Sequence, residues 1–263
     1  MIGDTTYRYP GELPVLVLTI MVVLLVIAVT ATATMCASVL FVGIVVMISF
    51  YTSQSSHRQL IHHAKRITPN SSPEIVSLIQ NCKKRIQPGE VEVFIAPSRQ
   101  LNAYTFGLSN PKTVVLYSGL FQVMDEDELS FILGHEFGHV RLGHTWLNSL
   151  IGGMAGIPSP SSASALIMLV FLWWNRMCEY SADRAGVLAC RKPDKAISAL
   201  IKLVAGPKGL TQEGMELAYT KIDAEDDTWE GNLNEALGTH PMIISRIKQI
   251  RQFATTNQYK RLV

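Results

Sequence analysis

Charged residues are scarce in this chain of 263 amino acids, and neither sign dominates. Lysine and arginine together number 23 against 21 aspartates and glutamates, which leaves a formal net charge of +2. A protein whose main partner is nucleic acid carries a marked basic excess on at least one surface. The near balance of charges therefore argues against nucleic acid as the main partner.

Cysteine is also rare, and its spacing follows no motif. The four cysteines include no CxxC pair; they are Cys36, Cys82, Cys178 and Cys190. The sequence therefore indicates neither a disulfide framework nor a thiolate zinc site, and it is compatible with a reducing compartment. Apart from apolar segments, repeats and low-complexity tracts are missing as well.

The N-terminal part of the chain has a long tract that is almost free of charge, from Leu13 to Phe50. As one helix it would be roughly 57 Å long, about twice the hydrocarbon thickness of a bilayer. We therefore favour a hairpin of two short transmembrane helices within residues 1–55, with a turn near Thr30–Thr34, over a single tilted span. A cleaved signal peptide is disfavoured because the tract is too long and lacks a basic leader.

Basic residues predict the orientation of this anchor. Arg58, Lys65 and Arg66 follow the apolar tract, whereas only Arg8 precedes it. The positive-inside rule then places the C-terminal body in the cytoplasm. We expect an integral protein of the cell (inner) membrane, with residues 56–72 as a linker and a folded domain at 73–263.

The first part of that domain has the pattern of a helix followed by strands. Ser72 and Pro73 suit the N-cap and first position of a helix. Val91–Ile95 and Thr113–Tyr117 have strand patterns, and the β-prone segment Asn102–Gly107 lies between them. We expect a small antiparallel sheet, an edge strand of which can hold an extended peptide by main-chain pairing.

The strongest chemical signal is the motif HEFGH at His135–His139. Histidines four residues apart share one face of a helix, close enough to hold one metal ion, and Glu136 is rotated aside toward a metal-bound water. Asp125 and Glu128 fit a capping box at the start of this helix. Taken alone, the motif has a second interpretation besides a metal site, which is an ordinary core helix with two hydrogen-bonded histidines.

Glycines within the motif helix predict close packing. Gly134, Gly138 and Gly143 each cost a helix about 1 kcal/mol relative to alanine. Such residues remove side-chain bulk, which indicates that another segment packs closely there. His144 is out of register with the HExxHxxGxxH pattern; on a continued helix it points roughly 140° away from His139, so we interpret it as a non-ligand.

A second apolar region, Trp146–Trp174, is interrupted by the Pro-Ser-Pro-Ser-Ser segment at 158–162. Each arm is short for a membrane span, so we expect a hydrophobic hairpin that rests on or dips into the membrane, with a hairpin inside the core as an equal alternative. The same helix continues into Glu179 and Asp183, which share one face. They are candidates for a third zinc ligand and for a carboxylate that orients a ligating histidine.

Taken in order, these elements resemble the HtpX-like membrane zinc endopeptidases, a group related to the CAAX prenyl endopeptidases. The resemblance covers about Ile86 to Arg251 and rests on a series of motifs: NAYTFG at Asn102, VVLYSGL at Val114, HEFGHVRLGH at His135, EYSADRAG at Glu179, and THP followed by Arg246. It implies an α+β, mostly helical fold with a zincin-type (gluzincin) catalytic domain.

The resemblance also implies residue roles. One zinc ion would be bound by His135, His139 and Glu179, with Asp183 and Arg246 supporting these ligands from behind. Asn102 and Ala103 would lie on the strand that pairs with the peptide, and His240 would be a transition-state donor or a reversible ligand. Glu136 would act as general base toward a metal-activated water. The expected substrates are membrane or misfolded proteins, as in protein quality control, and the lipid bilayer is the other expected partner.

Three other readings compete with this one. An intramembrane protease is disfavoured because the charged residues 125–128 and Arg141 lie too close to the motif. A prenyl-protein protease needs a multi-span chamber larger than this chain can form. The remaining alternative is a catalytically inactive, membrane-anchored scaffold that retains the fold.

Overall fold

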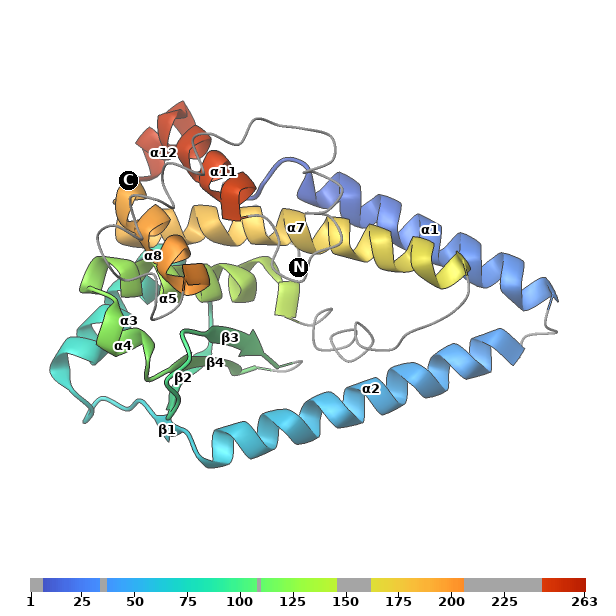
Figure 1. The fold of residues 1–263 in the computed structure, drawn as a ribbon, viewed down its shortest axis with the longest axis horizontal. Coiled ribbons are helices and arrows are strands. Elements are labelled where there is room, and N and C mark those ends of the chain that lie inside the picture. The colour runs from blue at the N-terminus through green and yellow to red at the C-terminus, as the bar shows by residue number, and fades with distance from the viewer. Residues whose placement is uncertain (1–6, 34–36, 108–109, 146–161, 206–242) are drawn as a thin grey trace.

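Helices form most of the structure, and a four-stranded sheet lies against them (Figure 1). The computed structural model describes residues 7–33, 37–107, 110–145, 162–205 and 243–263. In chain order the elements are α1 (Glu12–Ala33), α2 (Ala37–His62), β1 (Lys65–Arg66), α3 (Pro73–Ile86), β2 (Val91–Ala96), β3 (Ala103–Phe106), β4 (Lys112–Tyr117), α4 (Leu120–Val123), α5 (Glu126–Leu142), α7 (Ser162–Cys190), α8 (Pro193–Ala205), α11 (Ile243–Thr255) and α12 (Asn257–Leu262).

The sheet is mixed, with the strand order β1-β2-β4-β3. β2 runs parallel to β4, whereas β3 is antiparallel to β4 and β1 is antiparallel to β2. The prediction of a small antiparallel sheet is therefore wrong, because β3 turns back onto one edge of β4 and leaves its other edge to β2. Val114, Val115 and Leu116 of β4 are consecutive and all buried, which is typical of a strand covered on both faces.

The helix α5 carries the HEFGH motif and begins as its sequence predicts. The Asp125 side chain accepts a hydrogen bond from the backbone N–H of Glu128, and the Glu128 carboxylate accepts one from the N–H of Asp125. This reciprocal pair is the predicted capping box. The start of α3, with Ser72 as N-cap and Pro73 in the first turn, is also as predicted.

Close packing of α5 on α7 explains the glycines of the motif. A methyl group on Gly134 would overlap the Ala189 methyl group of α7, and one on Gly138 would lie 2.7 Å from the Ala185 Cβ. The prediction that another segment packs closely against the motif is confirmed at Gly134 and Gly138, whereas at Gly143 nothing lies within 4 Å of an added methyl group. This approach lets side chains on the two helices reach one another across the interface.

Replacing Gly138 with alanine should destabilise the protein by about 1–3 kcal/mol, because the added methyl group overpacks the α5–α7 interface. Gly43→Ala is the matched control, since nothing lies within 4 Å of a methyl group at that helical position. Thermal unfolding in detergent should lower the Tm of the Gly138 variant and not that of the control. Equal Tm values for Gly138→Ala and wild type would contradict the packing.

The end of α5 differs from the prediction. The helix stops at Leu142, and Gly143 caps it in the left-handed region with φ of 80°. Gly143 and His144 therefore do not continue the helix. The chain turns at Gly143, and the His144 ring faces the His139 ring, instead of pointing away from it as on a continued helix.

Among the described residues, one helix is long and apolar enough to cross a membrane, at Glu12–Ala31, with a mean hydropathy of 3.0. Only 11% of this window is buried, and the exposed side chains include Ile20, Met21, Leu24 and Leu25. The separate helix α2 extends beyond Phe50 to His62. The second span and the transmembrane hairpin stay predictions.

The helix α7 runs beside α1 (Figure 1) and continues without a break from Ser162 through Glu179 and Asp183, as predicted. Val15 of α1 packs in a small apolar cluster with Trp174 and Met177 of α7. Residues 146–161, in the first part of the predicted hydrophobic hairpin, lie outside the described residues.

Candidate metal centre

Two imidazoles and one carboxylate converge where α5 passes α7. The Nε2 atoms of His135 and His139 are 3.1 Å apart. The carboxylate oxygens of Glu179 lie 3.5 Å from these nitrogens, one oxygen to each ring. Ligand atoms held about 2.0–2.1 Å from a tetrahedral zinc ion are about 3.3 Å from one another. The three side chains therefore fit a single ion of this kind.

Glu136 lies beside this group and is held by a hydroxyl. The Thr105 Oγ1 donates to Glu136 Oε2 at 2.5 Å, and the Glu136 side chain is almost fully buried. Thr105 belongs to β3, so the sheet edge and the motif helix meet at the glutamate. Sequence patterns do not predict this contact, because Thr105 is 31 residues away from Glu136 along the chain.

Asp183 and Arg246 support the converging side chains from behind. Asp183 Oδ1 is 3.0 Å from His135 Nδ1, as expected for a carboxylate that orients this ring. Arg246 of α11 donates to both Asp183 oxygens, at 2.6 and 2.7 Å, and its Nη1 lies 3.1 Å from Glu179 Oε2. The arginine therefore links both carboxylates.

This arginine keeps the two carboxylates ionised. Burial alone would raise the pKa of Glu179, but the Arg246 guanidinium and the two histidines outweigh burial and hold that pKa well below its usual range. Asp183 has the same balance, in which burial is outweighed by Arg246 and His135, and its pKa is also lowered. A group of two imidazoles and an ionised carboxylate is a donor set suited to a divalent cation.

A cavity of about 380 Å³ opens onto these side chains. Its lining includes the donors, Glu136, Arg246, Asn102 and residues 103–105 of β3. The structure thus brings together every predicted site residue that it describes. His240 lies outside the described residues. Glu12 and His144, which lie behind His139, have no place in the sequence prediction of the site.

The fold and the converging side chains agree with a helical metallopeptidase. The chain belongs to peptidase family M48, whose sequence profile matches residues 69–254. Within that family it is HtpX-like, so the resemblance seen in the sequence is confirmed.

Curated relatives match most of the chain. The protease HtpX homologue of Tropheryma whipplei (strain Twist) is 26% identical over 233 residues, which cover 76% of this chain and 78% of the relative. The plastoglobule-localized metallopeptidase 48 of Arabidopsis thaliana (chloroplastic) is 24% identical over 75% of this chain. The matched part spans 61% of the Arabidopsis protein.

The crystal structure of Ste24p from S. mikatae has a similar fold. The TM-score is 0.51 at 17% sequence identity, and the match covers 90% of this chain and 61% of Ste24p. At this identity the likeness is one of fold alone.

Proposed function

We propose that the protein is a membrane-anchored zinc endopeptidase that binds one zinc ion through His135, His139 and Glu179. The observation that carries this proposal is the convergence of these three donors beside Glu136 in a chain of family M48. Two imidazoles and one glutamate form a known ligand set of catalytic zinc, which leaves a fourth position open.

The roles of the residues follow from their geometry. Zinc, when bound, lowers the pKa of water and polarises a peptide carbonyl. Glu136 accepts the proton of the attacking water and returns it to the leaving amine. Thr105 holds the Glu136 carboxylate in place, and Asp183 fixes the ring of His135. His240 stays a candidate donor to the oxyanion or a reversible ligand.

The proposed substrate is an extended segment of a membrane or misfolded protein. β3 is at one end of the strand order, and its residues line the cavity next to the metal ligands. A peptide that pairs with the main chain at Asn102 and Ala103 would pass in front of Glu136. Main-chain pairing tolerates many side chains, which suits a protease of broad specificity.

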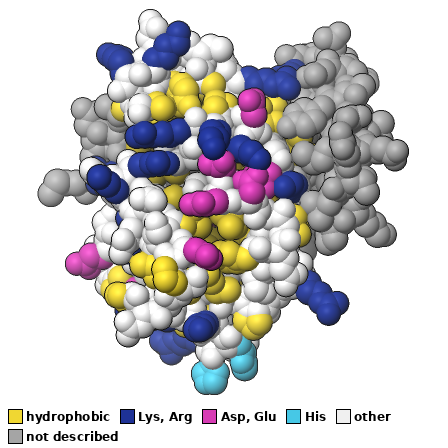
Figure 2. All heavy atoms as spheres, turned by 90° about the vertical axis from the view of Figure 1, so that its left-hand side faces the viewer, with side chains coloured by type: hydrophobic (Ala, Val, Ile, Leu, Met, Phe, Trp, Pro, Cys, Tyr) yellow, Lys and Arg dark blue, Asp and Glu magenta, His cyan; other side chains and the backbone are white. Residues whose placement is uncertain are grey.

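We propose that residues 1–55 anchor the protein in the membrane and that the peptidase domain, residues 73–263, faces the cytoplasm. The exposed apolar side chains of α1 favour a lipid environment for that helix. Charged side chains of both signs lie next to one another on the side of the molecule that Figure 2 shows, which is the left-hand side of Figure 1, whereas α1 extends to the right there. Ion pairs at the start of α5 join Asp125 to Lys195 and Asp127 to Lys192. Such a charged surface suits water.

The test is a metal and activity measurement on the full-length protein in detergent. We expect one zinc ion per chain, and casein cleavage that stops on addition of a chelator and returns with zinc. Elemental analysis and gel electrophoresis of casein measure the two properties. A purified chain that binds one zinc ion and cleaves neither casein nor itself would favour the inactive scaffold.

A further inference from the structure

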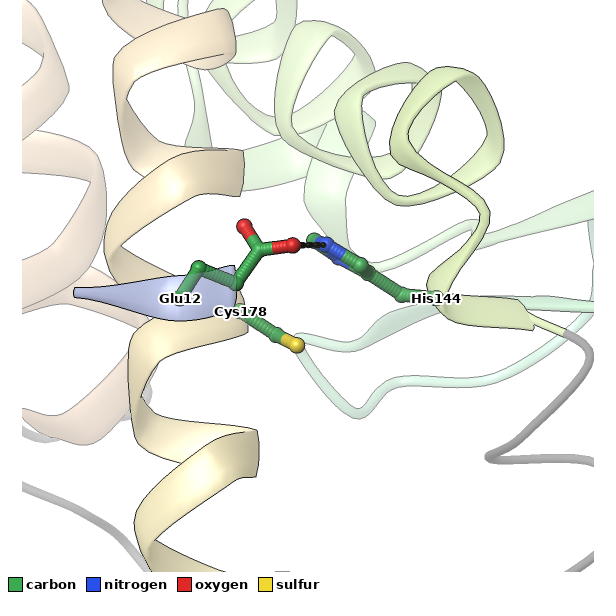
Figure 3. Close-up of side chains that lie close together, drawn as sticks. All are labelled: Glu12, His144 and Cys178. Atoms are coloured by element: carbon green, nitrogen blue, oxygen red, sulfur yellow. Dashed lines mark hydrogen bonds and ion pairs between the residues drawn. The ribbon is translucent and has the colours of Figure 1, made fainter. Parts of the chain in front are cut away.

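A second buried cluster lies behind the candidate metal centre. It contains Glu12 at the start of α1, His144 just after the end of α5, and Cys178 of α7 (Figure 3). Each side chain offers one possible ligand atom, and these atoms lie within 4.8 Å of one another. At most 1% of each residue is exposed, so the cluster is closed to solvent.

Hydrogen bonds join this cluster to the metal centre. The Nδ1 of His144 lies 2.9 Å from Nδ1 of His139, and the Nε2 of His144 lies 3.1 Å from Glu12 Oε1. The chain turns at Gly143, and the His144 ring then lies next to the His139 ring. A chain of contacts thus runs from α1 to one of the proposed zinc ligands.

The proton positions on His139 and His144 follow from the binding of a metal ion by His139. Because the Nε2 of His139 faces the other two donors, a neutral His139 carries its proton on Nδ1. His139 Nδ1 then donates to His144 Nδ1, and His144 Nε2 donates to the Glu12 carboxylate. Each contact in the series has one donor and one acceptor, so a single tautomer of each histidine satisfies them all.

We infer that His144 and Glu12 are positioning residues, which orient His139 for zinc as Asp183 orients His135. The two ligands are supported in parallel ways. Asp183 pairs with Arg246, and Glu12 pairs with Arg8, so each series ends on a carboxylate held by an arginine. The inference rests on the proposed zinc site and adds two residues to it.

Further contacts fix Glu12 in its position. The Ser181 hydroxyl donates to the Glu12 carboxylate, and it also accepts a hydrogen bond from the backbone N–H of Tyr9 at 2.8 Å. Arg8 donates to the carbonyl of Leu142 at 3.2 Å, at the last residue of α5. The segment before the apolar helix is thereby joined to both helices of the metal centre.

A second metal ion is the main alternative for this cluster. The Glu12 carboxylate already has three partners, which are Arg8, Ser181 and His144. A cation placed there would face the Arg8 guanidinium at close range. These contacts favour an orienting network over a metal site.

The experiment measures zinc affinity of the full-length protein by competition with a chelator. We expect His144→Ala to weaken zinc binding by about 10–100-fold and Glu12→Gln by about 10-fold, as for other partners of metal ligands. The double variant should bind zinc no more weakly than His144→Ala, because Glu12 acts only through His144. The absorption spectrum of the cobalt(II)-loaded protein, which depends on ligand geometry, should change in the His144 variant.

Cys178→Ala is the matched control within the cluster. It should bind one zinc ion with wild-type affinity and leave the cobalt spectrum unchanged. If Cys178→Ala lowers the metal content from two ions to one, the cluster is a second metal site and the inference is wrong. Wild-type zinc affinity in Glu12→Gln also overturns it, and this nearly isosteric variant serves even if His144→Ala does not fold. Failure of the proposed zinc site can be distinguished from failure of this inference, because the wild-type protein would then bind no zinc.

Discussion

Glu136→Gln should abolish peptide cleavage and leave one zinc ion bound. Glutamine has the shape of glutamate, and its amide does not accept the proton of the attacking water. General bases contribute about 10²–10⁴-fold to rate, so cleavage should fall by at least about 100-fold. Glu136 is not among the three converging donors, so the metal content should stay at the wild-type value. Casein cleavage and elemental analysis measure the two effects.

Glu128→Gln is the matched control for this experiment. Glu128 is on the same helix and is also buried, but it contacts Lys202 and Ser198 instead of the metal centre. A capping box accepts glutamine in place of glutamate, so α5 should still form. Cleavage should persist in this variant. Full cleavage by Glu136→Gln would refute the assignment of the general base.

Glu179→Ala should remove the zinc ion. The carboxylate is the sole donor of the proposed set that comes from α7, and two imidazoles alone bind zinc weakly. We expect zinc affinity to fall by more than the 10–100-fold that is typical for loss of an outer partner. The fold should persist because Arg246 keeps its two hydrogen bonds to Asp183. Zinc competition and thermal unfolding of the metal-free protein measure these effects.

Glu92→Ala is a control for the general loss of a carboxylate. Glu92 is on β2 and pairs with Arg66, away from the metal centre. The zinc affinity of the Glu92→Ala variant should equal that of the wild-type protein. Stoichiometric zinc of wild-type affinity in Glu179→Ala would mean that another residue is the third ligand.

Local features of the structure could be predicted with most success. The capping box at Asp125 and Glu128 needs residues only three positions apart, and it forms as expected. His135 and His139 share a face because a helix returns to the same side after four residues. The close approach of another segment at Gly138 was also predicted, because the glycine removes side-chain bulk there, but the sequence did not identify that segment as α7.

Features that join distant segments could not be predicted in the same way. The parallel pairing of β2 with β4 depends on which strand edge is free after β3 has folded back. The end of α5 at Leu142 was missed because a glycine both weakens a helix and caps it, and the residues around Gly143 do not distinguish the two roles. Because α5 ends at Leu142, His144 lies next to His139 instead of pointing away from it.

The sequence by itself determined the helix that carries two imidazoles and a glutamate, and a second helix with two carboxylates on one face. These follow from spacing along a single element, where geometry is the same in every helix. Only the tertiary structure decided that Glu179 meets both histidines, that Thr105 holds Glu136, and that Glu12 reaches His144. Such contacts join residues between 31 and 132 positions apart, and they depend on how whole elements pack, which no local pattern encodes.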